Sequence, residues 1–226
     1  MADTELILLR HGETDWNRER RVQGQLDTPL NAEGQRQALA AARHLSTRAA
    51  DYRLERDADR PEPLLLTSDL QRCRQTAAPI ATATGLVAEP DARLRERGYG
   101  VFEGRTLPEA QRVLGAQFQR WLARDPDFDV GGGESLRRFQ RRIEDALHDL
   151  VARHAGCTLV IVTHGGVLDI VNRMARSVPL DAPRDFEIPN ASLNRLRHRG
   201  GRFEILQWGD VSHWRRALDE IGPGAS

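Results

Sequence analysis

Short runs of apolar residues punctuate this chain and predict its strands. Residues 6–9, 64–67 and 159–163 consist only of Leu, Ile, Val and Thr, and each run is followed by a polar or glycine-containing sequence. Uninterrupted apolar runs of this length are typical of strands that are buried on both faces of a sheet. We therefore expect three buried strands, each of which leads into a loop.

Between these runs, hydrophobic residues recur at the three-to-four spacing of an amphipathic helix. One series contains Ala38, Leu39, Ala42 and Leu45, and another contains Leu136, Phe139, Ile143, Leu147 and Leu150. Asn31 and Ser135 stand where these helices should begin, and Ser68 with Gln71 matches the capping box of a further helix. Buried strands that alternate with amphipathic helices predict an α/β fold.

Near the C-terminus, residues 192–198 and 202–208 flank the turn sequence Arg199-Gly200-Gly201. This arrangement predicts a hairpin at one edge of the sheet. The expected sheet is therefore mixed, with mostly parallel strands. A chain of 226 residues suits a single domain, which we expect to span residues 1–226.

Two segments do not fit the alternation of strands and helices. Residues 48–63 are polar and rich in Arg, Asp and Pro, which predicts an exposed excursion. Residues 105–133 combine a helical piece around Val113, Phe118, Trp121 and Leu122 with the flexible sequence Gly131-Gly132-Gly133. Long connections are often functional, so this segment is either a lid or a packed connection.

Composition narrows the classes of function. Lys plus Arg number 33 and Asp plus Glu also number 33, and no long run of one charge points to nucleic acid or an anionic membrane. The N-terminus lacks a basic region before its apolar run, so a cytoplasmic protein is expected. The two cysteines and seven histidines show neither a disulfide framework nor the spacing of zinc ligands. We therefore expect no metal and no cofactor, and the protein to be a monomer or a homodimer.

Candidate chemistry gathers where the expected strands end. His11 and His164 each follow a buried strand and precede a glycine, and in open α/β sheets the ligand crevice lies beyond the carboxyl ends of the strands. Arg72 falls in the first turn of the helix after another strand, and Arg10 precedes His11. Guanidinium groups and a helix N-terminus together favour a phosphate group. A solvated surface position remains the alternative for Arg72.

Phosphoryl transfer needs a nucleophile, stabilisation of the equatorial oxygens and a proton for the leaving oxygen. A neutral imidazole is a competent nucleophile, and its phosphoramidate is labile enough to pass the group to water. Nearby arginines depress the pKa of His11 and favour its neutral form, whereas bound phosphate favours a cationic His164. Which histidine carries a proton stays open at this stage.

The residues resemble the histidine phosphatases, a family that includes the cofactor-dependent phosphoglycerate mutases. The resemblance runs through Leu9-Arg10-His11-Gly12-Glu13-Thr14, Pro29-Leu30-Asn31-Ala32-Glu33-Gly34, Ser68-Asp69-Leu70-Gln71-Arg72, Leu94-Arg95-Glu96, Gly133-Glu134-Ser135 and Val162-Thr163-His164-Gly165-Gly166. It implies a phosphoglycerate mutase-like fold, a three-layer αβα sandwich with helices on both faces of the sheet. It also implies a metal-independent phosphomonoester hydrolase that acts through a phosphohistidine.

The resemblance assigns roles to the matching positions. His11 corresponds to the phosphorylated nucleophile, Glu96 to the proton donor and later the base, and Arg10, Arg72 and His164 to the phosphate pocket. Glu13, Glu103 and Glu134 are weaker candidates for the acid, and Glu134 suits a carboxylate at a helix start. Further contacts with the substrate are expected from Asn17, Gln23, Gly24, Arg97, Tyr99 and Gly165. Arg97 either holds a second anionic group of the substrate or faces water.

Three functions remain open on the sequence. The sequence Glu96-Arg97-Gly98-Tyr99-Gly100, followed by Glu103-Gly104, lacks the histidine that the mutases carry in this stretch and resembles the phosphatase branch. A phosphatase acting on a small phosphate ester, such as a phosphosugar or phosphoglycerate, is therefore preferred. The alternatives are a cofactor-dependent phosphoglycerate mutase and a non-catalytic phosphate-binding module, although a pure binder has no need of an acid.

Overall fold

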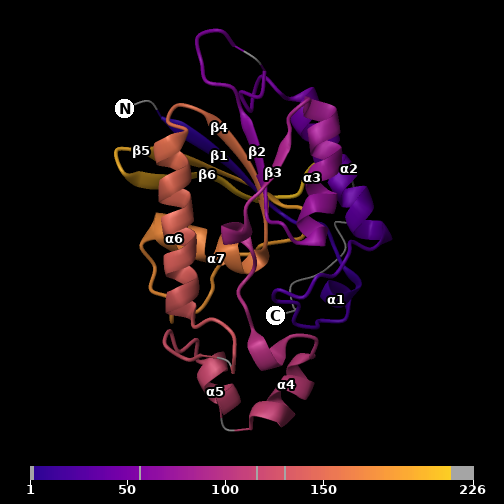
Figure 1. The fold of residues 1–226 in the computed structure, drawn as a ribbon, viewed down its shortest axis with the longest axis vertical. Coiled ribbons are helices and arrows are strands. Elements are labelled where there is room, and N and C mark those ends of the chain that lie inside the picture. The colour runs from indigo at the N-terminus through magenta and orange to yellow at the C-terminus, as the bar shows by residue number, and fades with distance from the viewer. Residues whose placement is uncertain (1–2, 56, 116, 130, 215–226) are drawn as a thin grey trace.

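A single six-stranded sheet forms the centre of the computed structural model, which describes residues 3–55, 57–115, 117–129 and 131–214 (Figure 1). The strands are β1 (Thr4–Arg10), β2 (Leu64–Thr67), β3 (Ala88–Pro90), β4 (Thr158–Thr163), β5 (Leu193–Arg199) and β6 (Arg202–Asp210). The three strands expected from apolar runs are β1, β2 and β4, and the expected hairpin is β5–β6.

The strand order is β3-β2-β4-β1-β5-β6. β1 pairs with β4, β4 with β2 and β2 with β3 in parallel, whereas β5 runs antiparallel to both β1 and β6. The mixed, mostly parallel sheet predicted from the sequence is therefore confirmed. β1 and β4 lie side by side in the middle, so the loops that follow them are neighbours.

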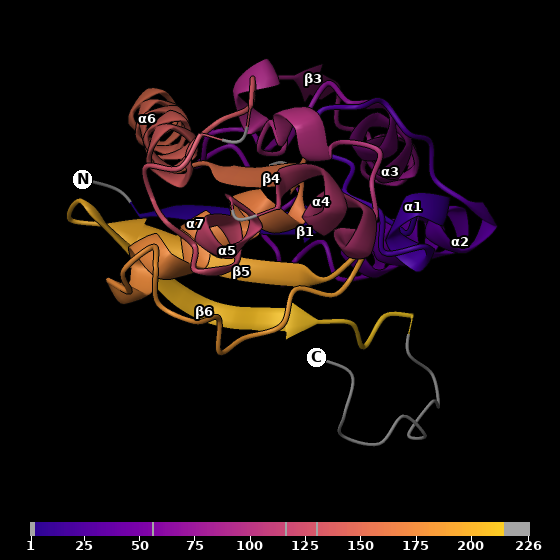
Figure 2. The same ribbon diagram turned by 90° about the horizontal axis from the view of Figure 1, so that it is seen from below.

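Helices cover both faces of this sheet (Figure 2). The α-helices of the described residues are α1 (Asp15–Arg18), α2 (Ala32–Thr47), α3 (Gln71–Thr84), α4 (Leu107–Leu114), α5 (Gln117–Leu122), α6 (Leu136–Arg153) and α7 (Gly165–Arg176). Successive residues of β1 alternate between two cores: Ile7 packs with α2 and α3, and Leu8 packs with α6 and α7. The strands β1, β2 and β4 are thus largely buried, and the three-layer αβα sandwich is confirmed.

Two of the three predicted helix starts are present. The Asn31 side chain accepts a hydrogen bond from the backbone N–H of Gly34, and the Ser135 side chain accepts one from Arg138. The prediction for Ser68 was wrong, because α3 begins at Gln71 and no side chain caps it. The Ser68 hydroxyl lies instead against a histidine of the site described below.

Two predictions about which residues are buried and which are exposed also need correction. Leu39 fits the spacing of α2, yet its side chain is 49% exposed, because that helix packs through its alanines and Leu45. The segment 48–63 is not wholly exposed, since Tyr52 and Leu54 are buried against α2 and the sheet. These two apolar residues anchor an otherwise polar excursion.

Residues 105–133 form α4, α5 and their connections, which lie beyond the lower end of the sheet in Figure 1. Phe118 of α5 is buried in a small cluster with Phe102 and Phe128, whereas Val113 and Leu122 are exposed. The segment therefore has a small core of its own, and its movement as a lid stays a prediction. Among the described residues, none of the helices combines the length and apolar character needed to cross a membrane.

Candidate active site

The pairing of β1 with β4 brings the two predicted histidines together. Arg10 is in register with Thr163, and the His11 N–H donates a hydrogen bond to the Thr163 carbonyl at 2.9 Å. The next residue on each strand is a histidine, and the ring centroids of His11 and His164 lie 5.3 Å apart. Two strand ends far apart in the sequence thus place their imidazoles in contact.

The loop after His11 is held by close backbone packing. A Cβ on Gly12 would lie 2.5 Å from the carbonyl oxygen of Gly34, which is backbone and cannot move aside. The Gly12 N–H donates to the Thr76 hydroxyl on α3 at 3.1 Å. Glycine at this position therefore lets the loop after His11 pack against the start of α2.

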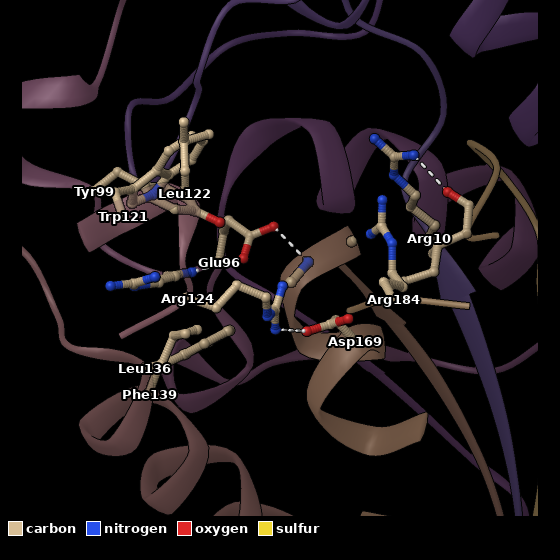
Figure 3. Close-up of a pocket in the computed structure, with 14 residues that line it drawn as sticks. Arg10, Glu96, Tyr99, Trp121, Leu122, Arg124, Leu136, Phe139, Asp169 and Arg184 are labelled. Carbon is tan, nitrogen blue, oxygen red and sulfur yellow. Dashed lines mark hydrogen bonds and ion pairs between the residues drawn. The ribbon is translucent and has the colours of Figure 1, made fainter. Parts of the chain in front are cut away.

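Two adjoining cavities lie at this end of the sheet. The small cavity, of about 190 Å³, is lined by Arg10, His11, Asn17, Arg21, Val22, Gln23, Gly24, Arg72, Glu96, Tyr99, Trp121 and Gly165. The large cavity, of about 500 Å³, is lined by Arg10, Glu96, Arg97, Tyr99, Trp121, Leu122, Arg124, Leu136, Phe139, Gly165, Gly166, Asp169, Arg184 and Ile188 (Figure 3). Arg10, Glu96 and Gly165 are among the residues that line both, so the two cavities form one continuous site.

His11 presents one ring nitrogen to the small cavity. Its Nδ1 lies 2.7 Å from the Gly12 carbonyl oxygen, which can only accept, so Nδ1 carries the proton. Nε2 then holds the lone pair and has no hydrogen-bond partner among the described residues. Burial, followed by the positive charges of Arg72 and Arg10, lowers the pKa of His11 well below its ordinary value of 6.5. The imidazole is therefore neutral at neutral pH and suited to nucleophilic attack.

Arg10 lies between the two cavities. Its Nη1 donates to the Ile188 carbonyl at 2.6 Å, while its Nε is buried without a partner in the described part of the chain. Burial lowers the pKa of Arg10 to about 10, so the guanidinium still carries its charge at neutral pH. A buried donor without an acceptor is a site where an anionic ligand is expected to bind.

Arg72 is fully buried and is oriented by backbone carbonyls. Its Nη2 donates to Gly24 at 2.7 Å, its Nη1 donates to Leu26 at 2.8 Å, and its Nε donates to Nδ1 of His164 at 3.3 Å. These bonds use three of its five N–H groups and leave two for a ligand in the small cavity. The predicted surface alternative for Arg72 is therefore wrong.

His164 lies behind Arg72 and lines neither cavity in this state. Because the arginine only donates, Nδ1 of His164 must accept, so Nε2 carries the proton and donates to the Ser68 hydroxyl at 2.8 Å. Burial, followed by the charge of Arg72, lowers the pKa of His164 well below 6.5. His164 is thus neutral here, and Ser68, which had been predicted as a helix cap, fixes its tautomer.

Glu96 is held where the two cavities meet. Its Oε1 accepts from the Arg97 N–H at 2.7 Å, and its Oε2 accepts from the Gly166 N–H at 2.9 Å. A carboxylate has about four lone-pair sites, so each oxygen keeps one for a reacting group. Backbone contacts on both sides thus position a carboxyl group at the boundary between the His11 cavity and the large cavity.

The predicted neutral contacts also line the small cavity. Gln23 accepts from the Thr14 and Thr28 hydroxyls through Oε1, which leaves its amide N–H₂ as a donor. Asn17 accepts from Asn190 through Oδ1 at 3.2 Å. Gly24 contributes its carbonyl to Arg72. The Gly165 N–H is in the first turn of α7, where backbone donors are free to bind anions.

Arg97 and Tyr99 line the large cavity. Arg97 does not face water, because its side chain is only 4% exposed and its Nε donates to the Glu134 carbonyl at 2.7 Å. Its guanidinium carbon lies 5.3 Å from the centre of the Tyr99 ring, within the range of a cation–π contact. Burial raises the pKa of Tyr99 above its ordinary value.

The competing carboxylates have structural partners. Glu13 accepts from the Asn31 side chain at 2.8 Å, and Glu103 accepts from the backbone N–H groups of Gln25 and Tyr99. Glu134 is not simply a helix-start carboxylate, since it pairs with Arg142 at 2.7 Å. Among the described residues, no group of three or more His, Cys, Asp or Glu side chains is arranged to hold a metal ion.

Sequence reasoning missed several residues around the site. Arg124, Asp169 and Arg184 line the large cavity, and Arg124 donates to Asp169 at 2.6 Å (Figure 3). Arg142 of α6 donates to the carbonyl of Glu96 at 3.1 Å and thereby supports the loop that carries this residue. Each lies in an ordinary helix or loop sequence with no motif of its own, so only the folded structure reveals its position.

Comparison with known proteins gives consistent results. The sequence profile of the histidine phosphatase superfamily (branch 1) matches residues 6–211. Phosphoglycerate mutase-like protein 4 of Arabidopsis thaliana is 36% identical, across 96% of this chain and 88% of its own. The structure of Bacillus stearothermophilus YhfR has a TM-score of 0.80 and 31% identity, covering 93% of this chain and 98% of its own. A mycobacterial glucosyl-3-phosphoglycerate phosphatase, solved as a complex with VO3, has a TM-score of 0.73 and 31% identity, covering 91% of this chain and 98% of its own.

Proposed function

Since this chain belongs to the histidine phosphatase superfamily (branch 1), we propose that it hydrolyses a phosphomonoester through a phosphohistidine at His11. One observation carries the proposal: the neutral His11 lines a cavity together with Arg10, Arg72 and Glu96, and its Nε2 has no hydrogen-bond partner in the part of the chain that the structure describes. These groups match the nucleophile, the charge stabilisation and the proton donor that phosphoryl transfer needs.

In the first step, the lone pair of His11 Nε2 attacks phosphorus, and the bond from phosphorus to the leaving oxygen breaks. Glu96 donates its proton to that oxygen, so the product leaves as an alcohol. The charge on the equatorial oxygens is stabilised by Arg10 Nε, by the two remaining N–H groups of Arg72 and by the Gly165 amide. The Nδ1–H bond to Gly12 keeps the ring in the tautomer that attack requires.

In the second step, water takes the place of the alcohol that has left. The Glu96 carboxylate removes a proton from this water as its oxygen attacks phosphorus, and the bond from phosphorus to Nε2 breaks. Inorganic phosphate leaves, and both Glu96 and His11 return to their starting states. Neutral His164 contributes by holding Arg72 through its Nδ1. The arginines supply the positive charge that stabilises the transferred group, and no step of the proposed reaction uses a metal.

The proposed substrate is a small phosphorylated metabolite, such as a phosphosugar or a phosphoglycerate. The small cavity suits the phosphoryl group, and the large cavity of about 500 Å³ has room for the leaving group. The similarity to a glucosyl-3-phosphoglycerate phosphatase supports the same class of substrate.

A mutase is the second candidate, because one of the similar proteins is named as phosphoglycerate mutase-like. In that reaction the phosphoryl group returns from His11 to a reoriented glycerate hydroxyl. Phosphate release should be measured without added metal on phosphosugars, phosphoglycerates, nucleotides and an aryl phosphate. We expect release to be faster than transfer between phosphoglycerates, and faster transfer would replace the phosphatase with the mutase.

A further inference from the structure

The large cavity carries more positive than negative charge. Its lining includes the guanidinium groups of Arg10, Arg97, Arg124 and Arg184, against the carboxylates of Glu96 and Asp169. Phosphate accounts for Arg10, which also lines the small cavity, but not for the other three arginines. The lining of this cavity therefore favours a leaving group that carries negative charge.

Both carboxylates already have partners. Glu96 accepts from two backbone N–H groups, and Asp169 pairs with Arg124 at 2.6 Å and with Arg173 at 3.1 Å. Arg97 and Arg184 thus have no carboxylate within ion-pairing distance in the described part of the chain. Arg97 is nevertheless held by carbonyls and by the Tyr99 ring. Among the described residues, no hydrogen bond, ion pair or ring contact is found for the Arg184 side chain.

Arg184 lies in the loop that follows α7, on the same side of the cavity as Arg10 (Figure 3). The charge of Arg184 contributes to the lowered pKa of Arg10, which places the two cations within electrostatic reach of each other. An anion between two like charges beside one cavity offsets their repulsion. Phosphate at His11 neutralises Arg10, whereas Arg184 is exposed beside the same cavity and is free to bind a second anion.

We propose that Arg184 binds a second anionic group, a carboxylate or a phosphate, on the leaving group of the substrate. This inference rests on the proposed function, since it assumes that the phosphoryl group is bound beside His11. Trp121, Leu136, Phe139 and Ile188 give the same cavity an apolar wall, against which the carbon skeleton of the leaving group packs. Arg184 is therefore a specificity-determining residue that the sequence motifs do not mark.

A pair of matched substrates tests this assignment. In 3-phosphoglycerate the leaving group carries a carboxylate, whereas in glycerol 3-phosphate a hydroxymethyl group replaces it. We expect Arg184→Gln to raise KM for 3-phosphoglycerate by about tenfold or more, as the loss of a charge-assisted hydrogen bond does. KM for glycerol 3-phosphate should stay within about twofold, and Arg184→Lys should recover much of the loss.

Arg202→Gln serves as the matched control, because Arg202 is exposed at the β5–β6 hairpin turn. This turn lies near the start of β1, whereas His11 follows the other end of that strand. The control variant should change neither KM. Equal effects of Arg184→Gln on both substrates would overturn the inference, since Arg184 would then contact the transferred phosphate. Unchanged KM values for both substrates would overturn the inference as well.

Binding to the His11→Ala variant separates this inference from the proposed function. Titration calorimetry on that variant, with and without Arg184→Gln, measures the Kd of the same two ligands without turnover. A selective loss of 3-phosphoglycerate affinity supports the second anion site even if the parent protein hydrolyses neither compound. If the protein hydrolyses no phosphate ester, the proposed function is wrong but the second anion site is unaffected. If Arg184→Gln leaves both Kd values unchanged, the second anion site is wrong but the proposed function is unaffected.

Discussion

At the scale of single residues, the proposed role of Glu96 can be tested separately from the roles of the other site residues. A proton donor matters most when the leaving oxygen is a poor leaving group, and an aryl oxygen needs little protonation. We expect Glu96→Gln to reduce kcat by roughly 10²- to 10⁴-fold for an alkyl phosphate and by much less for an aryl phosphate. Comparing the two substrates in a phosphate-release assay checks this. An equal loss for both would show that Glu96 acts in some other way.

Gly166 lies close to the Glu96 carboxylate and donates its backbone N–H to it. A Cβ at this residue would lie 2.1 Å from Glu96 Oε1, so the carboxylate must move away. We expect Gly166→Ala to lower kcat toward an alkyl phosphate by about 10²-fold or more, since it displaces the proton donor. Gly98→Ala is the control, because its nearest neighbour atom would lie at an ordinary 3.7 Å. A Gly166→Ala enzyme with normal kcat would contradict the described position of Glu96.

The lowered pKa of His11 predicts how activity responds to acid. Protonation blocks attack, but burial and the charges of Arg72 and Arg10 keep Nε2 unprotonated below the ordinary value of 6.5. As pH falls, kcat/KM, which reports the free enzyme, should therefore hold through 6.5 and decline only when pH reaches the lower pKa of His11. A pH profile of kcat/KM with an aryl phosphate, corrected for the titration of the ester itself, measures this, and an enzyme pKa of about 6.5 on the acid side would refute the shift.

Part of the site was predictable from the sequence, because some of its residues lie directly after apolar strands or in the helix that follows one. His11, His164 and Arg72 belong to this group, and their placement at one edge follows from the parallel sheet. Ser68 was misassigned, since the same hydroxyl fits a helix cap and a histidine partner equally well on sequence. Arg184 was missed because nothing in its local sequence indicates which part of the molecule its loop will reach.

At the scale of elements, the most informative contact joins α6 to the Glu96 loop. Arg142 donates to the carbonyls of Arg93, Arg95 and Glu96 and also pairs with Glu134. Its side chain is only 22% exposed, so water replaces these bonds poorly. The helix and the loop are therefore coupled through one guanidinium group.

Replacing this group tests the coupling. We expect Arg142→Met to lower the free energy of unfolding by about 2–4 kcal/mol, because it leaves the Glu134 carboxylate without its ion-pair partner. It should also lower kcat by loosening Glu96. Urea denaturation and phosphate release measure the two effects. Arg141→Met is the control on the exposed face of the same helix, and equal effects of both variants would contradict the coupling.

The elements themselves were predictable where hydrophobic periodicity is strong. The buried strands and the long helices α2 and α6 follow directly from it. The short strand β3 and the helix α1 carry too few residues for a periodic signal, and they depend on pairing and packing with distant parts of the chain. Leu39 illustrates the same limit, because periodicity alone does not define the width of the buried face.

At the scale of the whole molecule, strand order determines what the site contains. Because β4 and β1 are adjacent, His164 lies beside His11, and the N-terminus of α7 lies beside both. Arg72 reaches the same point from the neighbouring strand β2, and the Glu96 loop reaches it from the edge strand β3. Residues of segments 105–133 and 177–192 also line the large cavity, so in the proposed function the leaving group contacts parts of the chain other than the loops that carry His11 and Arg72.

The central claim is that the phosphoryl group passes through His11, and rapid-quench labelling tests it most directly. The protein is mixed with a ³²P-labelled phosphate ester, quenched in alkali and digested, and the labelled peptide is identified by mass spectrometry. We predict an acid-labile phosphoenzyme with the label on His11, formed at least as fast as phosphate is released and absent from His11→Ala. Label that persists in His11→Ala, or steady hydrolysis by that variant at the parent rate, would contradict the account.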